Sequence, residues 1–137
     1  MTLVLALICS DGILMAPDGQ STFSTAAGPM RLPSEKIRVF AGRLLWGGSG
    51  DVGLHQKIEL VFNDIDKAAR SRPIGKLRPE IRGKVLGEQK AAQQSYLDIA
   101  PQFPLPTAHV LLGGYDGERP WILEIDPNGT DTQLEDY

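Results

Sequence analysis

The chain has 137 residues, 42% of them hydrophobic and 23% charged, which fits one domain over residues 1–137 with a buried core. Its net charge of −3 and pI near 5.3 give no electrostatic surface for nucleic acid or an anionic membrane. One cysteine, Cys9, excludes a disulfide framework and a thiolate metal site. With no apolar run of membrane length and no signal-peptide pattern, we expect a soluble cytoplasmic protein.

Apolar runs bounded by Gly, Asp and Pro in the first third of the chain predict two consecutive β-hairpins. Between them, the polar and proline-bearing residues 20–35 predict a loop or an irregular hairpin. The first apolar run has no polar alternation, so we expect its strand to be buried on both faces. The predicted strands cover residues 3–9, 13–16, 36–40 and 44–46.

The middle of the chain predicts two helices. Apolar residues recur at helical spacing over 54–69, and Asp51 is placed to cap the N-terminus of this first helix. Residues 71–76 break the pattern. The second helix is expected to begin near Pro79, a residue suited to the first helical turn, and to continue to Ile99.

Three prolines after residue 100 predict a stiff connector to a final three-stranded meander. Its predicted strands cover residues 108–115, 121–125 and 130–136. Runs of strands and runs of helices, instead of strict alternation, predict an α+β fold with mostly antiparallel sheets.

The glycine-rich stretch 47–51 joins the fourth predicted strand to the first helix. Residues 48–53 fit G-x-G-x-x-G, but Asp51 would put a carboxylate where a pyrophosphate binds, and no parallel strand follows the helix. Asp51 also occupies the final glycine position of G-x-S-x-G. We therefore expect no nucleotide cofactor, and a tight turn whose backbone N–H groups are free to face a substrate oxyanion.

A few polar residues are candidates for chemistry. His55 and His109 have no acidic or thiol partner at metal-ligand spacing, so we expect surface or core roles and no metal. Asp18 ends the strand that returns from the first hairpin and should lie level with Thr2, while Lys36 opens the third strand, which we expect at the same edge. From spacing alone, a turn Asp, a strand-edge Lys and a Thr within a strand remain the simpler interpretation.

Taken together, several ordered motifs resemble the proteasome β-subunit and HslV-like branch of the N-terminal-nucleophile hydrolases. The resemblance spans essentially the whole chain and implies a four-layer αββα sandwich with antiparallel sheets, here lacking the family's C-terminal third. The matching stretches are Thr2-Leu3-Val4, residues 10–18, Glu35-Lys36-Ile37, residues 47–51, Gly113-Gly114-Tyr115-Asp116 and residues 125–129.

The resemblance also implies a threonine-type endopeptidase without a cofactor or metal. Thr2 would be the nucleophile after removal of Met1, and its freed α-amine would accept the proton. Lys36 would lower the effective pKa of the nucleophile, Asp18 would orient Lys36, and the backbone N–H of Gly47 would supply the oxyanion hole.

Such proteins form stacked homo-oligomeric rings that degrade peptides or unfolded proteins and usually act with an ATP-driven unfoldase, so the resemblance implies the same partners here. Two alternatives stay open. One is a non-catalytic ring or scaffold subunit, or a transpeptidase-type relative, on the same fold. The other is a small α+β binding module in which Thr2, Asp18 and Lys36 coincide by chance.

Overall fold

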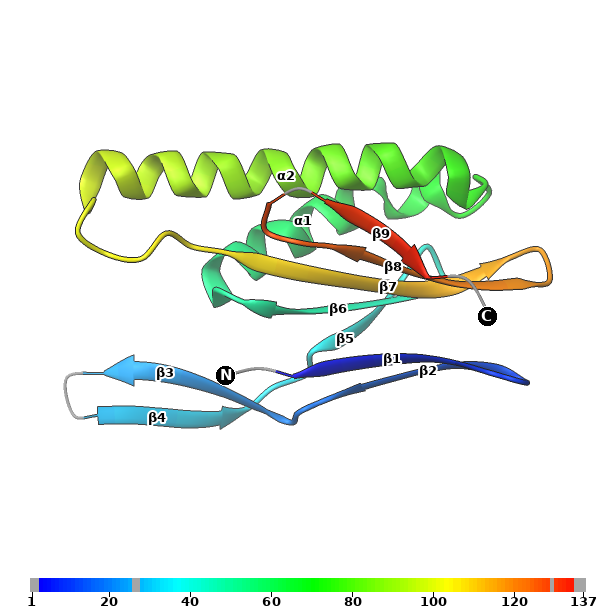
Figure 1. Cartoon of the computed structure of the whole chain (residues 1–137), viewed down its shortest axis with the longest axis horizontal. Coiled ribbons are helices and arrows are strands. Elements are labelled where there is room, and N and C mark those ends of the chain that lie inside the picture. Colours follow the sequence, from blue (N-terminus) through cyan, green and yellow to red (C-terminus); the bar gives the residue numbers. More distant parts are fainter. Residues whose placement is uncertain (1–2, 26–27, 129, 135–137) are drawn as a thin grey trace.

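The computed structural model describes residues 3–25, 28–128 and 130–134. Strands come first along the chain, then two helices, then strands again (Figure 1), as predicted for an α+β protein. The elements are β1 (Val4–Cys9), β2 (Gly12–Pro17), β3 (Gln20–Thr25), β4 (Gly28–Pro33), β5 (Ile37–Phe40), β6 (Leu44–Gly50), α1 (Val52–Ala69), α2 (Ile74–Ile99), β7 (Ala108–Asp116), β8 (Arg119–Ile125) and β9 (Asp131–Leu134).

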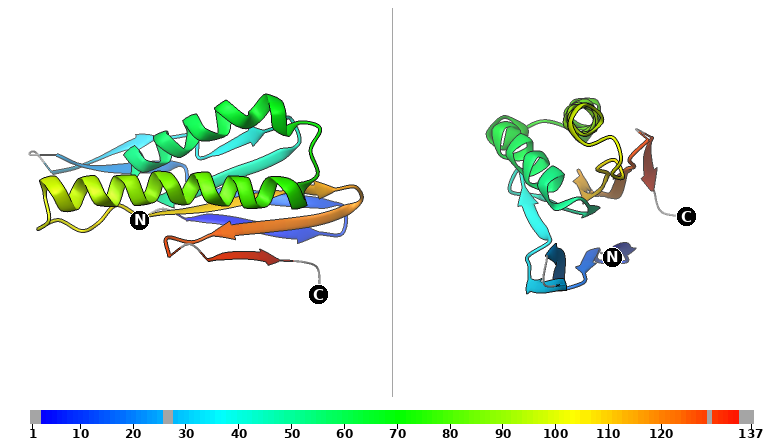
Figure 2. Two further views of the ribbon diagram at one scale, coloured as in Figure 1. Left: turned by 90° about the horizontal axis from the view of Figure 1, so that it is seen from above. Right: turned by 90° about the vertical axis from the view of Figure 1, so that its left-hand side faces the viewer.

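These elements form three layers, which the end-on view in Figure 2 separates. Both helices pack on one face of an antiparallel sheet with strand order β5-β6-β7-β8-β9. The hairpins β1–β2 and β3–β4 form the layer on the other side of that sheet. Within the described residues, no second helical layer covers the outer side of the hairpins. No described helix is long and apolar enough to cross a membrane.

Helix α1 forms because one face of it is apolar and its N-terminus is capped. The predicted face is buried against the sheet, where the Phe62 ring stacks on Trp46 at 4.5 Å and meets Phe40 edge-on at 4.9 Å. Asp51 Oδ1 accepts the Leu54 N–H at 2.9 Å, which confirms the predicted cap.

The prediction that the second helix begins near Pro79 is wrong: α2 begins at Ile74, and Pro79 lies inside it. Pro73 is the N-cap residue, with extended backbone at φ −60° and ψ 146°. An interior proline costs about 3 kcal/mol. Burial of Ile74 and Leu77, 8% and 0% exposed, offsets this because each buried aliphatic side chain contributes about 1.5–3 kcal/mol.

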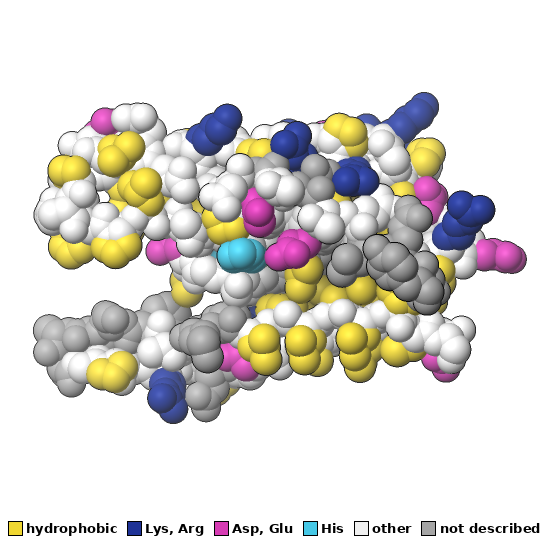
Figure 3. All heavy atoms as spheres, in the orientation of Figure 1, with side chains coloured by type: hydrophobic (Ala, Val, Ile, Leu, Met, Phe, Trp, Pro, Cys, Tyr) yellow, Lys and Arg dark blue, Asp and Glu magenta, His cyan; other side chains and the backbone are white. Residues whose placement is uncertain are grey.

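Contrary to the prediction of burial on both faces, β1 is half-buried on one face and exposed on the other. The inward side of the β1–β2 hairpin packs toward the five-stranded sheet, where a Cβ on Gly113 would lie 3.0 Å from Ile13 Cγ2 of β2. On the outer side Leu3, Leu5 and Leu7 are 50–56% exposed, and Figure 3 shows a row of hydrophobic side chains along this hairpin. The sequence of β1 does not alternate between apolar and polar residues because both faces of the strand are apolar, and the described residues cover one of these faces.

Two further boundaries differ from the prediction. Residues 20–35 contain a regular hairpin, with Gln20 of β3 opposite Pro33 of β4, so three hairpins precede the helices. Strand β6 continues through Gly50, and most of the glycine stretch is therefore strand, not turn.

Candidate active site

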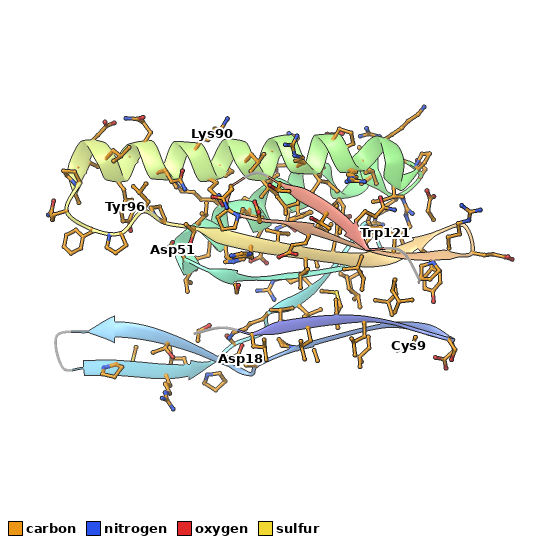
Figure 4. All side chains as sticks on the ribbon, viewed as in Figure 1. Cys9, Asp18, Asp51, Lys90, Tyr96 and Trp121 are labelled. Atoms are coloured by element: carbon orange, nitrogen blue, oxygen red, sulfur yellow. The ribbon has the colours of Figure 1, made fainter. Side chains whose placement is uncertain are left out.

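Asp18 and Lys36 meet beside the start of β1. In the β1–β2 register Val4 lies opposite Pro17, which brings Asp18 level with Leu3. Lys36 Nζ donates to Asp18 Oδ1 at 2.7 Å, and the Leu3 N–H donates to the same oxygen at 3.0 Å. The Asp18 N–H in turn donates to the Leu3 carbonyl at 2.9 Å. One carboxylate therefore ties the first described residue of the chain to the lysine (Figure 4 labels Asp18).

The electrostatics of this pair favour the charged form of Asp18. The Lys36 side chain is only 8% exposed, whereas that of Asp18 is 36% exposed. The hydrogen bond from Lys36, with that from the Leu3 N–H, holds the pKa of Asp18 below its ordinary 3.8. The carboxylate is thus ionised at neutral pH and fixes the nearly buried ammonium in one orientation.

Thr2, the predicted nucleophile, lies outside the described residues, as does Met1. The residue that follows it, Leu3, is anchored on both its N–H and its carbonyl by Asp18.

Gly47, the predicted oxyanion-hole residue, lies in β6 between Ile37 of β5 and Leu111 of β7. A Cβ on Gly47 would stand 2.6 Å from the Lys36 carbonyl oxygen, so glycine is required by the close approach of these two backbones. The next glycine, Gly48, is packed in the same way against the carbonyl of His109. Asp18, Lys36 and Gly47 are thus brought together, although Gly47 belongs to a strand and not to the predicted turn.

A cavity of about 300 Å³ opens beside Lys36, between the end of β4, strands β5 and β6, and the first turns of α1. On its wall Arg38 Nε donates to Glu59 Oε1 at 2.5 Å, which joins β5 to α1. Neither residue was a sequence candidate. They are 21 positions apart, and only the packing of α1 on the sheet brings them together.

His55 also lines this cavity and is half-buried. Burial lowers its pKa below the ordinary 6.5, so the imidazole is neutral at neutral pH. Its Nε2 is buried without a hydrogen-bond partner in the described part of the chain. Within that part, no group of three or more His, Cys, Asp or Glu side chains is arranged to hold a metal.

No protein-family model matches the sequence, and no curated protein matches it. Solved structures do match the fold. The Anbu complex from Pseudomonas aeruginosa, described as a helical assembly, matches with a TM-score of 0.74 and 16% identity over 98% of this chain and 56% of that chain. Anbu, the ancestral beta-subunit, from Yersinia bercovieri matches with a TM-score of 0.69 and 16% identity over 98% and 56%.

HslV from Trypanosoma brucei matches with a TM-score of 0.50 and 16% identity over 98% of this chain and 67% of that chain. The chain therefore spans little more than half the length of the Anbu chains that it matches. The antiparallel α+β arrangement of this protein is similar to the fold of the Anbu and HslV structures.

Proposed function

We propose that the protein is a threonine-type endopeptidase whose nucleophile is Thr2 after removal of Met1. The observation that carries the proposal is the shared Asp18 oxygen, which accepts from both Lys36 Nζ and the backbone N–H immediately after Thr2. This contact links a nearly buried ammonium to the residue next to a hydroxyl-bearing N-terminus, which is the arrangement that an amine-assisted nucleophile needs.

In the proposed reaction, the Thr2 hydroxyl attacks a substrate carbonyl while its α-amine takes the proton. The tetrahedral oxyanion accepts a hydrogen bond from the Gly47 N–H. Collapse of this intermediate breaks the C–N bond, and the protonated α-amine donates to the leaving amine. Water then attacks the resulting ester while the α-amine accepts a proton from it. The C–O bond to Thr2 breaks, and the α-amine returns the proton to the Thr2 oxygen as the carboxylic acid product leaves.

Lys36 acts electrostatically in this scheme. Its positive charge favours the developing alkoxide of Thr2, and the ion pair with Asp18 at 2.7 Å holds the ammonium in place. Asp18 is therefore a positioning residue, because it acts on the reacting atoms through Lys36 and through the Leu3 N–H.

We further propose that the chain acts as a homo-oligomeric ring on peptides or unfolded proteins, with an ATP-driven unfoldase. The end of α2 and the connector after it support assembly, because exposed apolar residues surround a groove there. Tyr96, labelled in Figure 4, lines this groove, and the large exposed apolar residues of its lining are Tyr96, Ile99, Phe103 and Leu105. Light scattering should give a multiple of 14.9 kDa, and a stable monomer would contradict this part. A cytoplasmic location remains a prediction from the sequence.

The test is cleavage of short fluorogenic peptides by the wild-type chain, Thr2→Ala and Thr2→Ser. Wild type should cleave, Thr2→Ala should not, and Thr2→Ser should retain part of the rate because it keeps a hydroxyl next to the amine. If a Met1-free wild-type chain cleaves nothing, the peptidase proposal is wrong and the non-catalytic ring subunit on the same fold takes its place.

A further inference from the structure

In the proposed reaction, the cavity beside Lys36 would receive a side chain of the substrate. It borders Lys36 on one side and Gly48, Ser49 and Gly50 on another, next to the Asp18–Lys36 pair. If the substrate carbonyl that is attacked lies beside Lys36, the side chain of the same substrate residue lies within reach of the cavity. The lining of the cavity then determines which residue precedes the cleaved bond.

Each of the two cations on the cavity wall, Lys36 and Arg38, is paired with at least one carboxylate. Lys36 is paired with Asp18 at 2.7 Å. Arg38 Nε donates to Glu59 at 2.5 Å, and Arg38 Nη1 lies 3.5 Å from the Glu35 carboxylate at the exposed rim. Each cation on the wall therefore has a carboxylate partner.

The rest of the wall is uncharged. Apolar surface comes from Leu32, Trp46 and Val52. The hydroxyls of Ser21 and Ser34 form a hydrogen bond with each other at 2.8 Å. A volume of about 300 Å³ has room for one large side chain. A charged side chain entering this wall would lose water and find every opposite charge already paired.

We propose that the Arg38–Glu59 ion pair sets the substrate class of this site: it keeps the cavity neutral and so selects a large uncharged residue, such as Leu, Phe or Tyr, before the cleaved bond. This inference rests on the proposed peptidase function. The pair is suited to the role because it closes the wall between β5 and α1, while its side chains remain 35% and 33% exposed. Removing Arg38 leaves Glu59 without the cation it contacts, and removing Glu59 leaves Arg38 with only the exposed carboxylate of Glu35.

The experiment compares kcat/KM for three fluorogenic peptides that differ only in Leu, Lys or Glu before the bond. Wild type should prefer Leu over both charged residues by at least about tenfold. Arg38→Met leaves Glu59 unmatched and should raise the Lys-to-Leu ratio about tenfold, as expected for one paired or unpaired charge. Glu59→Gln should raise the Glu-to-Leu ratio similarly, because the remaining contact of Arg38 is with the exposed Glu35.

The double variant Arg38→Glu with Glu59→Arg restores an opposite pair and should restore the preference for Leu. The matched control is Arg70→Met, which breaks another α1 ion pair, to Asp66 at 2.9 Å, away from the cavity lining. It should leave all three ratios unchanged. Ratios are used because a partly unfolded variant loses activity toward all three peptides equally.

The selectivity is also measured without catalysis, so that its failure is distinguishable from failure of the peptidase proposal. The same three sequences, as acetylated peptide amides, are titrated by calorimetry into wild type and the two single variants. The inference predicts the same order of preference in the affinities, even if nothing is cleaved. Ratios unchanged within about twofold in both Arg38→Met and Glu59→Gln, an equal response in Arg70→Met, or no binding of any peptide would overturn it.

Discussion

Replacing Gly47 by alanine tests the close approach on which the candidate site depends. The added Cβ would stand 2.6 Å from the Lys36 carbonyl oxygen and 3.3 Å from Ile37 Cγ1, whereas ordinary contact begins at 3.4 Å. The Lys36 backbone, which directly precedes β5, must therefore move by about 0.8 Å relative to Gly47. Overpacking of this kind destabilises by about 1–3 kcal/mol.

This displacement acts on both stability and catalysis. For a chain of this size, each kcal/mol lowers Tm by about 3–4 °C, so we expect a fall of about 3–12 °C by calorimetry. A 1 Å misplacement of reacting groups costs up to about a hundredfold in rate, so kcat for the fluorogenic peptides should fall about ten- to a hundredfold, with KM little changed.

Gly83→Ala is the matched control for this substitution. No atom lies within 4 Å of its added Cβ, and alanine in a helix interior is about 0.5–1 kcal/mol more stable than glycine. Its Tm should rise slightly and its kcat should not change. A Gly47→Ala protein with wild-type Tm and wild-type kcat would refute the claim that Gly47 is required for the placement of Lys36.

Three further substitutions test the fold and the ion pair. The pKa of Asp18 is lower in the folded chain than its ordinary 3.8. The ionised Asp18 therefore stabilises the folded chain fully above pH 3.8, and this stabilisation is lost as the pH falls through the lowered pKa. Asp18→Asn should flatten the pH dependence of Tm between about pH 5 and about pH 2. Phe62→Ala, at 2% exposure, should destabilise by about 3–5 kcal/mol, while Leu60→Ala on the same helix, at 63% exposure, should change Tm little. Asp51→Ala removes the cap on the Leu54 N–H and should cost about 1 kcal/mol by chemical denaturation, whereas Asp64→Ala on the exposed side of α1 should be nearly neutral.

Local chemistry made much of the fold predictable. The helical spacing of apolar residues in α1 and its Asp51 cap depend only on residues close together in the sequence, so both were predicted correctly. The beginning of α2 was predicted wrongly, because the free energy that favours it comes from the burial of Ile74 and Leu77 against other elements. The β3–β4 hairpin was missed as a regular element because residues 20–35 are polar and small, without the apolar alternation that marks a half-buried strand.

Some contacts of the candidate site could likewise be predicted from the sequence, and others could not. Asp18 is expected near the start of the chain because a tight hairpin returns its second strand to the beginning of the first, and its 3.0 Å contact with the Leu3 N–H agrees with that geometry. The Arg38–Glu59 pair depends instead on how α1 packs against β5, a tertiary relation with no local signal. The same holds for Gly47, whose requirement for glycine comes from the neighbouring strand.

The central claim is that Thr2 becomes a nucleophile with a free α-amine. The most direct measurement is intact and peptide-level mass spectrometry after incubation with an epoxyketone-type electrophile, with Cys9→Ser included because Cys9 is an exposed free thiol. The proposal predicts that Met1 is absent and that one adduct forms on Thr2, in wild type and Cys9→Ser alike and not in Thr2→Ala. A Met1-free chain that stays unmodified, or one that is labelled only at Cys9, would contradict it.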